Sequence, residues 1–123
     1  MARILIVEDN DVLNKAYELI LTHNGHTVAT AYDGKEGLAR AKKVDPELIL
    51  LDMLMPNLDG IGFLKAYDVS HKHPTVKIIL LTNISEKGVV EQALRLGANE
   101  YFLKAQLTPA QLVDMIDKQL ASK

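Results

Sequence analysis

Five polar side chains in this sequence each follow a short run of mostly apolar residues. Glu8 and Asp9 come directly after ILIV, and Asp52 comes directly after LILL. Thr82 follows IILL, and Lys104 follows EYFL. Such runs predict strands, and ligands of open parallel sheets bind beyond the carboxyl ends of the strands. We therefore expect three carboxylates, one hydroxyl and one ammonium group to meet at one edge of a sheet.

These residue types suit phosphoryl transfer. Three carboxylates at one point raise one another's pKa, and a hard divalent cation removes that cost. Mg²⁺ is the cation that we expect to bind, with Mn²⁺ as an alternative. Mg²⁺ takes oxygen ligands and keeps bound waters that a phosphate oxygen can replace. Lys104 and Thr82 could hold other phosphoryl oxygens. Asp52 remains as the nucleophile, since carboxylates form acyl phosphates.

Strands and helices are predicted to alternate along the chain. The predicted strands are Ile4–Val7, Thr27–Ala31, Glu47–Leu51, Val76–Leu81 and Glu100–Leu103. Three of them have unbroken aliphatic cores, which indicates strands covered on both faces. Strand–helix–strand units pair in parallel with right-handed crossovers. We expect an open, doubly wound α/β sheet of order 2-1-3-4-5, because this order puts the most apolar strands in the middle.

The helix starts are predicted from capping residues. The first helix runs from Asp11 to His23 and ends at Asn24-Gly25. Later helices are expected to start at Asp33, Asp59-Gly60, Ser85 and Thr108-Pro109, which makes five in all. The last start is the clearest, because Thr108 and Gln111 have the spacing of a capping box.

Composition narrows the classes of function. The chain has 123 residues, no cysteine, and a net charge of −2 from 14 basic and 16 acidic side chains. A single domain, 1–123, is expected from this length. The lack of cysteine excludes disulfides and thiol chemistry, and the charge balance gives no case for binding nucleic acid or an anionic membrane. No apolar run is long enough to span a bilayer, so we expect a cytoplasmic protein with no direct nucleic-acid or membrane partner.

The chain resembles the receiver domains of two-component response regulators over essentially its whole length. The matching segments are ILIVEDN (4–10), LILLDMLMPNLDG (48–60), IILLTN (78–83) and LGANEYFLKA (96–105). The resemblance implies a flavodoxin-like fold, with Asp52 as the phosphoacceptor. It also implies that Asp9 is a direct metal ligand, that Glu8 acts largely through water, and that the backbone carbonyl of Leu54 completes the protein's share of the metal shell.

By the same resemblance, Thr82 and Lys104 hold the phosphoryl group, and Tyr101 changes rotamer with phosphorylation. The donor would be a phosphohistidine on a sensor histidine kinase or a phosphotransfer protein, as in a phosphorelay. The chain would be a stand-alone signalling switch, not an enzyme, catalysing only its own phosphorylation and slow dephosphorylation. It would change the face formed by the fourth predicted helix, the strand Glu100–Leu103 and the last helix. An unknown downstream protein would read that face, with a phosphorylation-dependent homodimer as an option, unless the chain is a fragment with a further output segment.

Departures from the family pattern at four positions concern backbone geometry and the rate of dephosphorylation. Ala105 follows Lys104 where many receivers have proline in a cis peptide, so this bond is either trans or strained. Leu54 and Ile84 are aliphatic at positions where polar groups in the family help water to attack the phosphoryl group. Asn83 is larger than the residue common at its position. These residues predict slow self-dephosphorylation.

Alternative interpretations remain open for single residues and for the whole chain. Glu8 and Asp9 could form only a helix-start turn, Lys104 could be a surface lysine, and Tyr101 could serve packing alone. A dinucleotide-binding fold is disfavoured, because the acidic turn after the first strand would repel a pyrophosphate. A phosphohydrolase would typically have a second aspartate where Leu54 stands. A receiver-like module that binds partners without being phosphorylated is the remaining rival.

Overall fold

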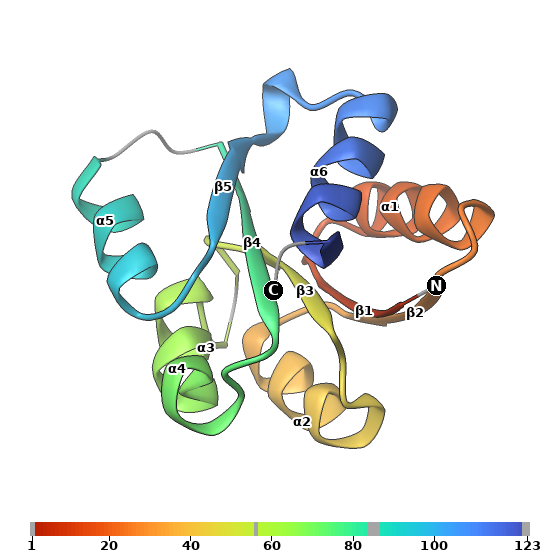
Figure 1. The fold of residues 1–123 in the computed structure, drawn as a ribbon. Helices are drawn as coiled ribbons and strands as arrows, with labels where there is room; N and C mark the ends of the chain where they lie inside the picture. The colour runs from red at the N-terminus through yellow and green to blue at the C-terminus, as the bar shows by residue number, and fades with distance from the viewer. Residues whose placement is uncertain (1, 56, 84–86, 122–123) are drawn as a thin grey trace.

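A single parallel sheet forms the middle layer of the molecule, with helices on both of its faces (Figure 1). The computed structural model describes residues 2–55, 57–83 and 87–121, apart from the side chain of Lys87. The strands are β1 (Arg3–Val7), β2 (Thr27–Ala31), β3 (Leu48–Asp52), β4 (Lys77–Thr82) and β5 (Glu100–Leu103). The helices are α1 (Asp11–His23), α2 (Gly34–Val44), α3 (Gly60–Tyr67), α4 (Val69–Lys72), α5 (Lys87–Arg95) and α6 (Pro109–Ala121), with a 3₁₀ turn at Lys104–Gln106.

The strand order is β2-β1-β3-β4-β5, and every neighbouring pair is parallel. This confirms the predicted flavodoxin-like topology. Strands β1, β3 and β4 occupy the centre and are buried along almost their whole length, whereas β2 and β5 form the edges and are only partly buried. The most apolar strands thus lie where both faces are covered.

Alternate residues of the central strands supply two separate cores. One face of the sheet, with Leu5, Ile49 and Leu80, packs against α2, α3, α4 and α5. The opposite face, with Ile6 and Leu50, packs against α1 and α6. Because successive side chains of a strand point to opposite faces, the unbroken aliphatic runs are what a sheet covered on both sides requires.

Most of the predicted helix starts are confirmed. Asp33 accepts from the backbone N–H of Glu36 at 2.8 Å, and Asp59 caps α3 through the N–H of Gly62 at 2.8 Å. Thr108 and Gln111 form the reciprocal capping box, with bonds of 3.0 and 3.2 Å. The predicted cap Ser85 lies outside the described residues.

Two details differ from the predictions, and one open alternative is settled. Strands β3 and β4 lie one residue later than predicted at both ends, since their ladders extend through Asp52 and Thr82, and β1 begins one residue earlier, at Arg3. Val69–Lys72 forms a short sixth helix, α4, beyond the five predicted, and the N–H groups of His71 and Lys72 donate to the carbonyl of Asp68 at 3.2 and 2.9 Å. No cis peptide occurs among the described residues, so the Lys104–Ala105 bond is trans. Within the same residues, no helix has the length and apolar character needed to cross a bilayer.

Candidate functional site

Most of the predicted site residues meet in a cleft of about 270 Å³ at the carboxyl edge of the sheet. The residues lining this cleft are Glu8, Asp9, Asn10, Leu13, Asp52, Leu54, Thr82, Asn83 and Lys104. They come from the ends of β1, β3, β4 and β5 and from the start of α1. The topology therefore brings together side chains that lie up to 96 residues apart in the sequence, from Glu8 to Lys104.

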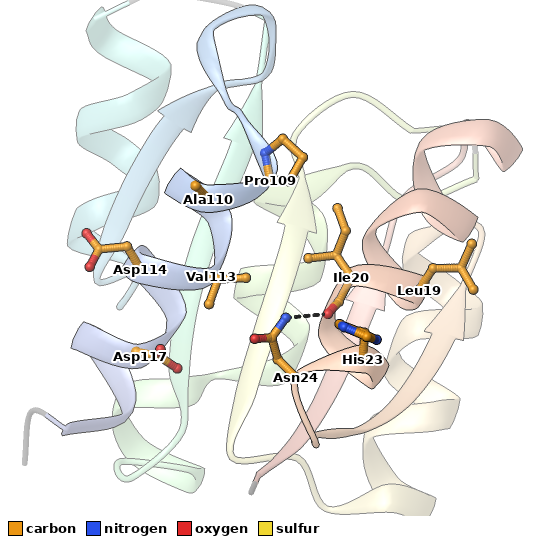
Figure 2. A pocket seen from close by; sticks show the side chains of 9 residues that line it. All are labelled: Leu19, Ile20, His23, Asn24, Pro109, Ala110, Val113, Asp114 and Asp117. Carbon is orange, nitrogen blue, oxygen red and sulfur yellow. Dashed lines mark hydrogen bonds between the residues drawn. The ribbon is translucent and has the colours of Figure 1, made fainter.

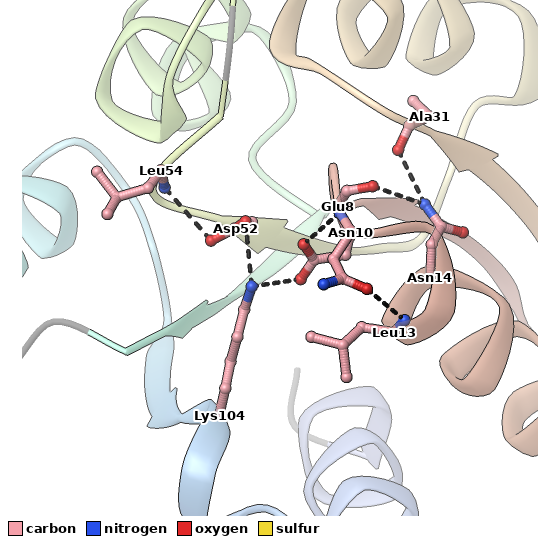
Figure 3. Close-up of polar contacts among 8 residues, drawn as sticks. All are labelled: Glu8, Asn10, Leu13, Asn14, Ala31, Asp52, Leu54 and Lys104. Carbon is pink, nitrogen blue, oxygen red and sulfur yellow. Dashed lines mark hydrogen bonds and ion pairs between the residues drawn. The ribbon is translucent and has the colours of Figure 1, made fainter.

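Lys104 binds two carboxylates at once (Figure 3). Its Nζ lies 2.5 Å from Glu8 Oε1 and 3.1 Å from Asp52 Oδ2. Burial alone would lower the pKa of Lys104, but its close contacts with the negatively charged Glu8 and Asp52 outweigh burial and raise it. The side chain of Lys104 is only 10% exposed, so the alternative of a plain surface lysine is wrong.

The Asp52 carboxyl group has a strongly perturbed pKa. Burial, followed by repulsion from Glu8, raises its pKa from 3.8 to about 7, against the lowering effect of Lys104. The side chain is 6% exposed, and its Oδ1 accepts from the backbone N–H of Leu54 at 3.3 Å. The single charge of Lys104 therefore does not fully compensate the negative charge of the surrounding carboxylates, and a second cation would reduce their mutual repulsion.

The Glu8–Asp9 turn supplies the other two acids. Glu8 is buried, and its Oε2 accepts from the N–H of Asn10 at 3.0 Å. Asp9 is exposed toward the cleft opening. One carboxylate oxygen from each of Glu8, Asp9 and Asp52 lies within 4.8 Å of the others, a spacing that allows one cation to contact all three.

The donor set fits a hard divalent cation. All three candidate side-chain ligands are carboxylates, which Mg²⁺ prefers over nitrogen or sulfur ligands. Glu8 Oε1 is buried without a hydrogen bond of good geometry among the described residues, and its partner is the charge of Lys104. A buried oxygen matched only by charge gains from a bound cation nearby.

Four of the predicted residues need separate comment. Thr82 is buried at the end of β4 and Asn83 is exposed, and both line the cleft. Tyr101 does not line the cleft: the residue is 45% exposed on β5, in register with Leu80 of β4. Ile84 lies outside the described residues.

The loop between β3 and α3 is anchored to the start of α2. The Nδ2 of Asn57 donates to Asp33 Oδ2 at 2.7 Å, and the N–H of Gly34 donates to the carbonyl of Leu58 at 3.1 Å. A Cβ on Gly34 would lie 2.2 Å from that carbonyl oxygen. This anchoring was not predicted from the sequence, although a glycine after the capping Asp33 could have suggested a close backbone approach.

A wider depression lies between α1 and α6 and does not belong to this cleft (Figure 2). Its lining residues are Leu19, Ile20, His23, Asn24, Pro109, Ala110, Val113, Asp114 and Asp117. None of these residues lines the acidic cleft. Its open, largely apolar surface contains no cluster comparable to the three carboxylates and lysine at the sheet edge.

The fold and the site together define a class of protein. A five-stranded doubly wound sheet carries acids after its first and third strands, a threonine at the end of the fourth and a lysine after the fifth. The family model described as the response regulator receiver domain matches residues 4–117. The chain belongs to this family, whose members act in phosphorylation-dependent signalling by two-component systems.

Individual relatives agree with this assignment. The chain is 38% identical over 104 residues to the transcriptional regulatory protein AfsQ1 of Streptomyces coelicolor, covering 85% of this chain and 45% of that protein. Among solved structures, a CheY-like receiver domain from Methanospirillum hungatei is 28% identical with a TM-score of 0.89, covering 100% of this chain and 99% of that one. The chemotaxis protein CheY4 of Vibrio cholerae is also 28% identical, with a TM-score of 0.88 over 96% and 98% of the two chains. The chain spans about half the length of the curated relatives that it matches.

Proposed function

We propose that this chain is a signalling switch in which Asp52 accepts a phosphoryl group in the presence of Mg²⁺. The observation that carries the proposal is the arrangement of charges: Lys104 contacts both Glu8 and Asp52, and Asp9 lies close enough to share a cation with them. A carboxylate that is buried beside a lysine, at the mouth of a cleft, is positioned to act as a nucleophile toward an incoming phosphorus atom.

In the proposed reaction, a carboxylate oxygen of Asp52 attacks the phosphorus atom of the donor. An O–P bond forms while the N–P bond of a donor phosphohistidine breaks, and the imidazole nitrogen keeps the electron pair. Lys104 stabilises the charge on one phosphoryl oxygen, and the hydroxyl of Thr82 donates to another. The backbone N–H of Leu54, which already points at Asp52 Oδ1 at 3.3 Å, orients the attacking carboxylate.

Glu8, Asp9, Asp52 and the backbone carbonyl of Leu54 would hold the Mg²⁺, with Glu8 acting largely through water and Mn²⁺ as a substitute. When bound, Mg²⁺ neutralises the negative charge that accumulates on the phosphoryl oxygens. The protein's own share of the work is positioning, since the acids, the lysine and the threonine come from different strand ends of one rigid sheet.

A phosphoryl group on Asp52 would change the surface of the protein. It gives Thr82 a strong acceptor, so the threonine hydroxyl turns toward it. Tyr101, half-exposed in this structure, then turns inward, and the face formed by α5, β5 and α6 changes. A partner that prefers one state of this face shifts the equilibrium toward that state. We expect a histidine kinase or phosphotransfer protein as the donor, an unidentified downstream protein as the reader, and the cytoplasm as the compartment.

Self-dephosphorylation is expected to be slow. Leu54 is 59% exposed at the cleft, and its side chain has no polar group to orient an attacking water. Asn83 at the same opening narrows access to the phosphoryl group. These side chains are therefore expected to lengthen the lifetime of the phosphorylated state.

Intact-mass measurement after incubation with acetyl phosphate tests the proposal. We expect one phosphate adduct that requires Mg²⁺ and is absent in Asp52→Asn, while the exposed control Asp114→Asn is modified like the wild type. An adduct that persists in Asp52→Asn would show that another residue is the acceptor. Continuous release of phosphate over many turnovers would favour a phosphohydrolase, and the lack of any adduct would favour a receiver-like module that is not phosphorylated.

A further inference from the structure

Asn14 is a fully buried polar residue on α1, with 0% of its surface exposed. It shares the inward face of the helix with Tyr17 and Leu21, where an apolar side chain would be expected. Its Nδ2 donates two hydrogen bonds, to the carbonyl of Glu8 at 2.9 Å and to the carbonyl of Ala31 at 3.1 Å (Figure 3). Its Oδ1 has no hydrogen-bond partner among the described residues. A buried carboxamide oxygen without a hydrogen bond destabilises the fold. Any benefit of Asn14 must therefore come from the two hydrogen bonds that its Nδ2 donates.

Both bonds fall where the sheet ladder stops. The pairing of β1 with β2 ends at Val7 and Ala31, and the N–H of Glu8 makes the last backbone bond, to Ala31 at 3.0 Å. Beyond that point the chain turns away through Asp9 toward α1. Asn14 binds the carbonyls of Glu8 and Ala31 together and so fixes the point at which the turn leaves the sheet.

The same turn is held on its other side by Asn10. The N–H of Asn10 donates to Glu8 Oε2 at 3.0 Å, and the carbonyl of Asn10 accepts from the N–H of Asn14 at 2.9 Å. The backbone of Glu8 is thus tied to the helix through Asn14, and its carboxylate is tied to the turn through Asn10. Asp9 lies between these two attachments.

We propose that Asn14 is a positioning residue for the acid cluster: its buried carboxamide holds the Glu8–Asp9 turn so that both carboxylates stay close to Asp52. The inference rests on the proposed function. Three carboxylates within 4.8 Å repel one another, and an unrestrained turn would relieve that repulsion by moving Asp9 outward. By holding the backbone of Glu8, Asn14 opposes this movement and lowers the free-energy cost of bringing the metal ligands together.

The test is Mg²⁺ affinity, followed by the shifts of backbone amide NMR signals as MgCl₂ is added to the wild type and to Asn14→Leu. Leucine has a similar volume and suits the buried face but donates no hydrogen bond. We expect Mg²⁺ to bind Asn14→Leu roughly 10-fold more weakly, the lower end of what loss of an outer-shell partner of a metal site costs. Asn14→Ser is the second variant, because it cannot clash and its short hydroxyl cannot reach both carbonyls.

Leu21→Ala is the matched control. Leu21 is fully buried on the same helix face, in the core beneath α1 and not in the acidic cleft. This control should lower the free energy of unfolding at least as much as the Asn14 variants and keep wild-type Mg²⁺ affinity. Wild-type affinity in both Asn14 variants would overturn the inference alone, and so would an equal loss of affinity in Leu21→Ala. Failure of the wild type to bind Mg²⁺ at all would instead overturn the proposed function, and this inference with it.

Discussion

The raised pKa of Asp52 predicts an unusual pH dependence of stability in the metal-free protein. In the folded chain the pKa is raised from 3.8 to about 7. Because the folded state holds this proton more tightly than the unfolded state, the stabilising contribution is fully present below pH 3.8 and is lost as pH rises through 7. The direction is opposite to that of a salt-bridged surface carboxylate.

The size of the effect follows from the shift. With one pKa unit worth about 1.4 kcal/mol, linkage gives a loss of about 2–3 kcal/mol in the free energy of unfolding between pH 5 and pH 8. Lys104, whose pKa is raised above its ordinary value of 10.5, does not titrate in this window. The raised pKa of Asp52 therefore dominates among the perturbed groups between pH 5 and pH 8.

Urea unfolding in EDTA, at pH values from 5 to 8, measures this directly for the wild type, Asp52→Asn and the exposed control Asp114→Asn. Asp52→Asn removes the titrating group, so its stability should stay nearly level and exceed that of the wild type at pH 8 by about 2–4 kcal/mol. Asp114→Asn should follow the wild-type slope, because its carboxylate is 66% exposed and forms only a surface ion pair with Lys118. If the curves of the wild type and Asp52→Asn run parallel, the assignment of a strained charge cluster around Asp52 is refuted.

Three further predictions follow from the same cleft and its supports. Mg²⁺ at a fixed concentration should raise the melting temperature more at pH 8 than at pH 5.5, since binding requires the ionised Asp52. Equal increases in melting temperature at the two pH values, measured by calorimetry, would contradict this. Gly34→Ala should lower the free energy of unfolding by about 1–3 kcal/mol, because the new Cβ would clash with the carbonyl of Leu58. Gly88→Ala in α5, with open space around it, should raise the free energy of unfolding by about 0.5–1 kcal/mol. If urea unfolding shows the same effect for both variants, the anchoring of the loop at Gly34 is contradicted. Leu54→Asn should shorten the lifetime of the phosphorylated protein several-fold, measured by intact mass over time; an unchanged or longer lifetime would remove Leu54 from the control of hydrolysis.

The sheet and the convergence of the acids were predictable because they depend on backbone periodicity. Unbroken aliphatic runs give buried parallel strands, and the strand-end rule then places Glu8, Asp52 and Lys104 at one edge. No exact boundary is needed for this, so the one-residue shift of β3 left the site prediction unchanged. Single residues such as Lys104 carry no signal of their own, and only the topology turns a common lysine into a buried one.

The supporting contacts were less predictable, because they depend on tertiary geometry. Asn14 lies three residues before Tyr17 on the buried stripe of α1, which is a detectable signal, but its partner Ala31 is set by the pairing of β1 with β2. The bond between Asn57 and Asp33 spans 24 residues and joins two loops. The turn α4 follows Asp68, which adopts a left-handed backbone conformation with φ 52°. A positive φ is uncommon for residues other than glycine, so the sequence does not predict it.

A crystal structure with Mg²⁺ and beryllofluoride, a mimic of the phosphoryl group, tests the central claim most directly. The account predicts beryllofluoride on the carboxylate of Asp52, in contact with Lys104 and Thr82. It also predicts Mg²⁺ about 2.1 Å from oxygens of Asp9 and Asp52. Beryllofluoride on another residue, or a cation bound away from the Glu8–Asp9 turn, would contradict it.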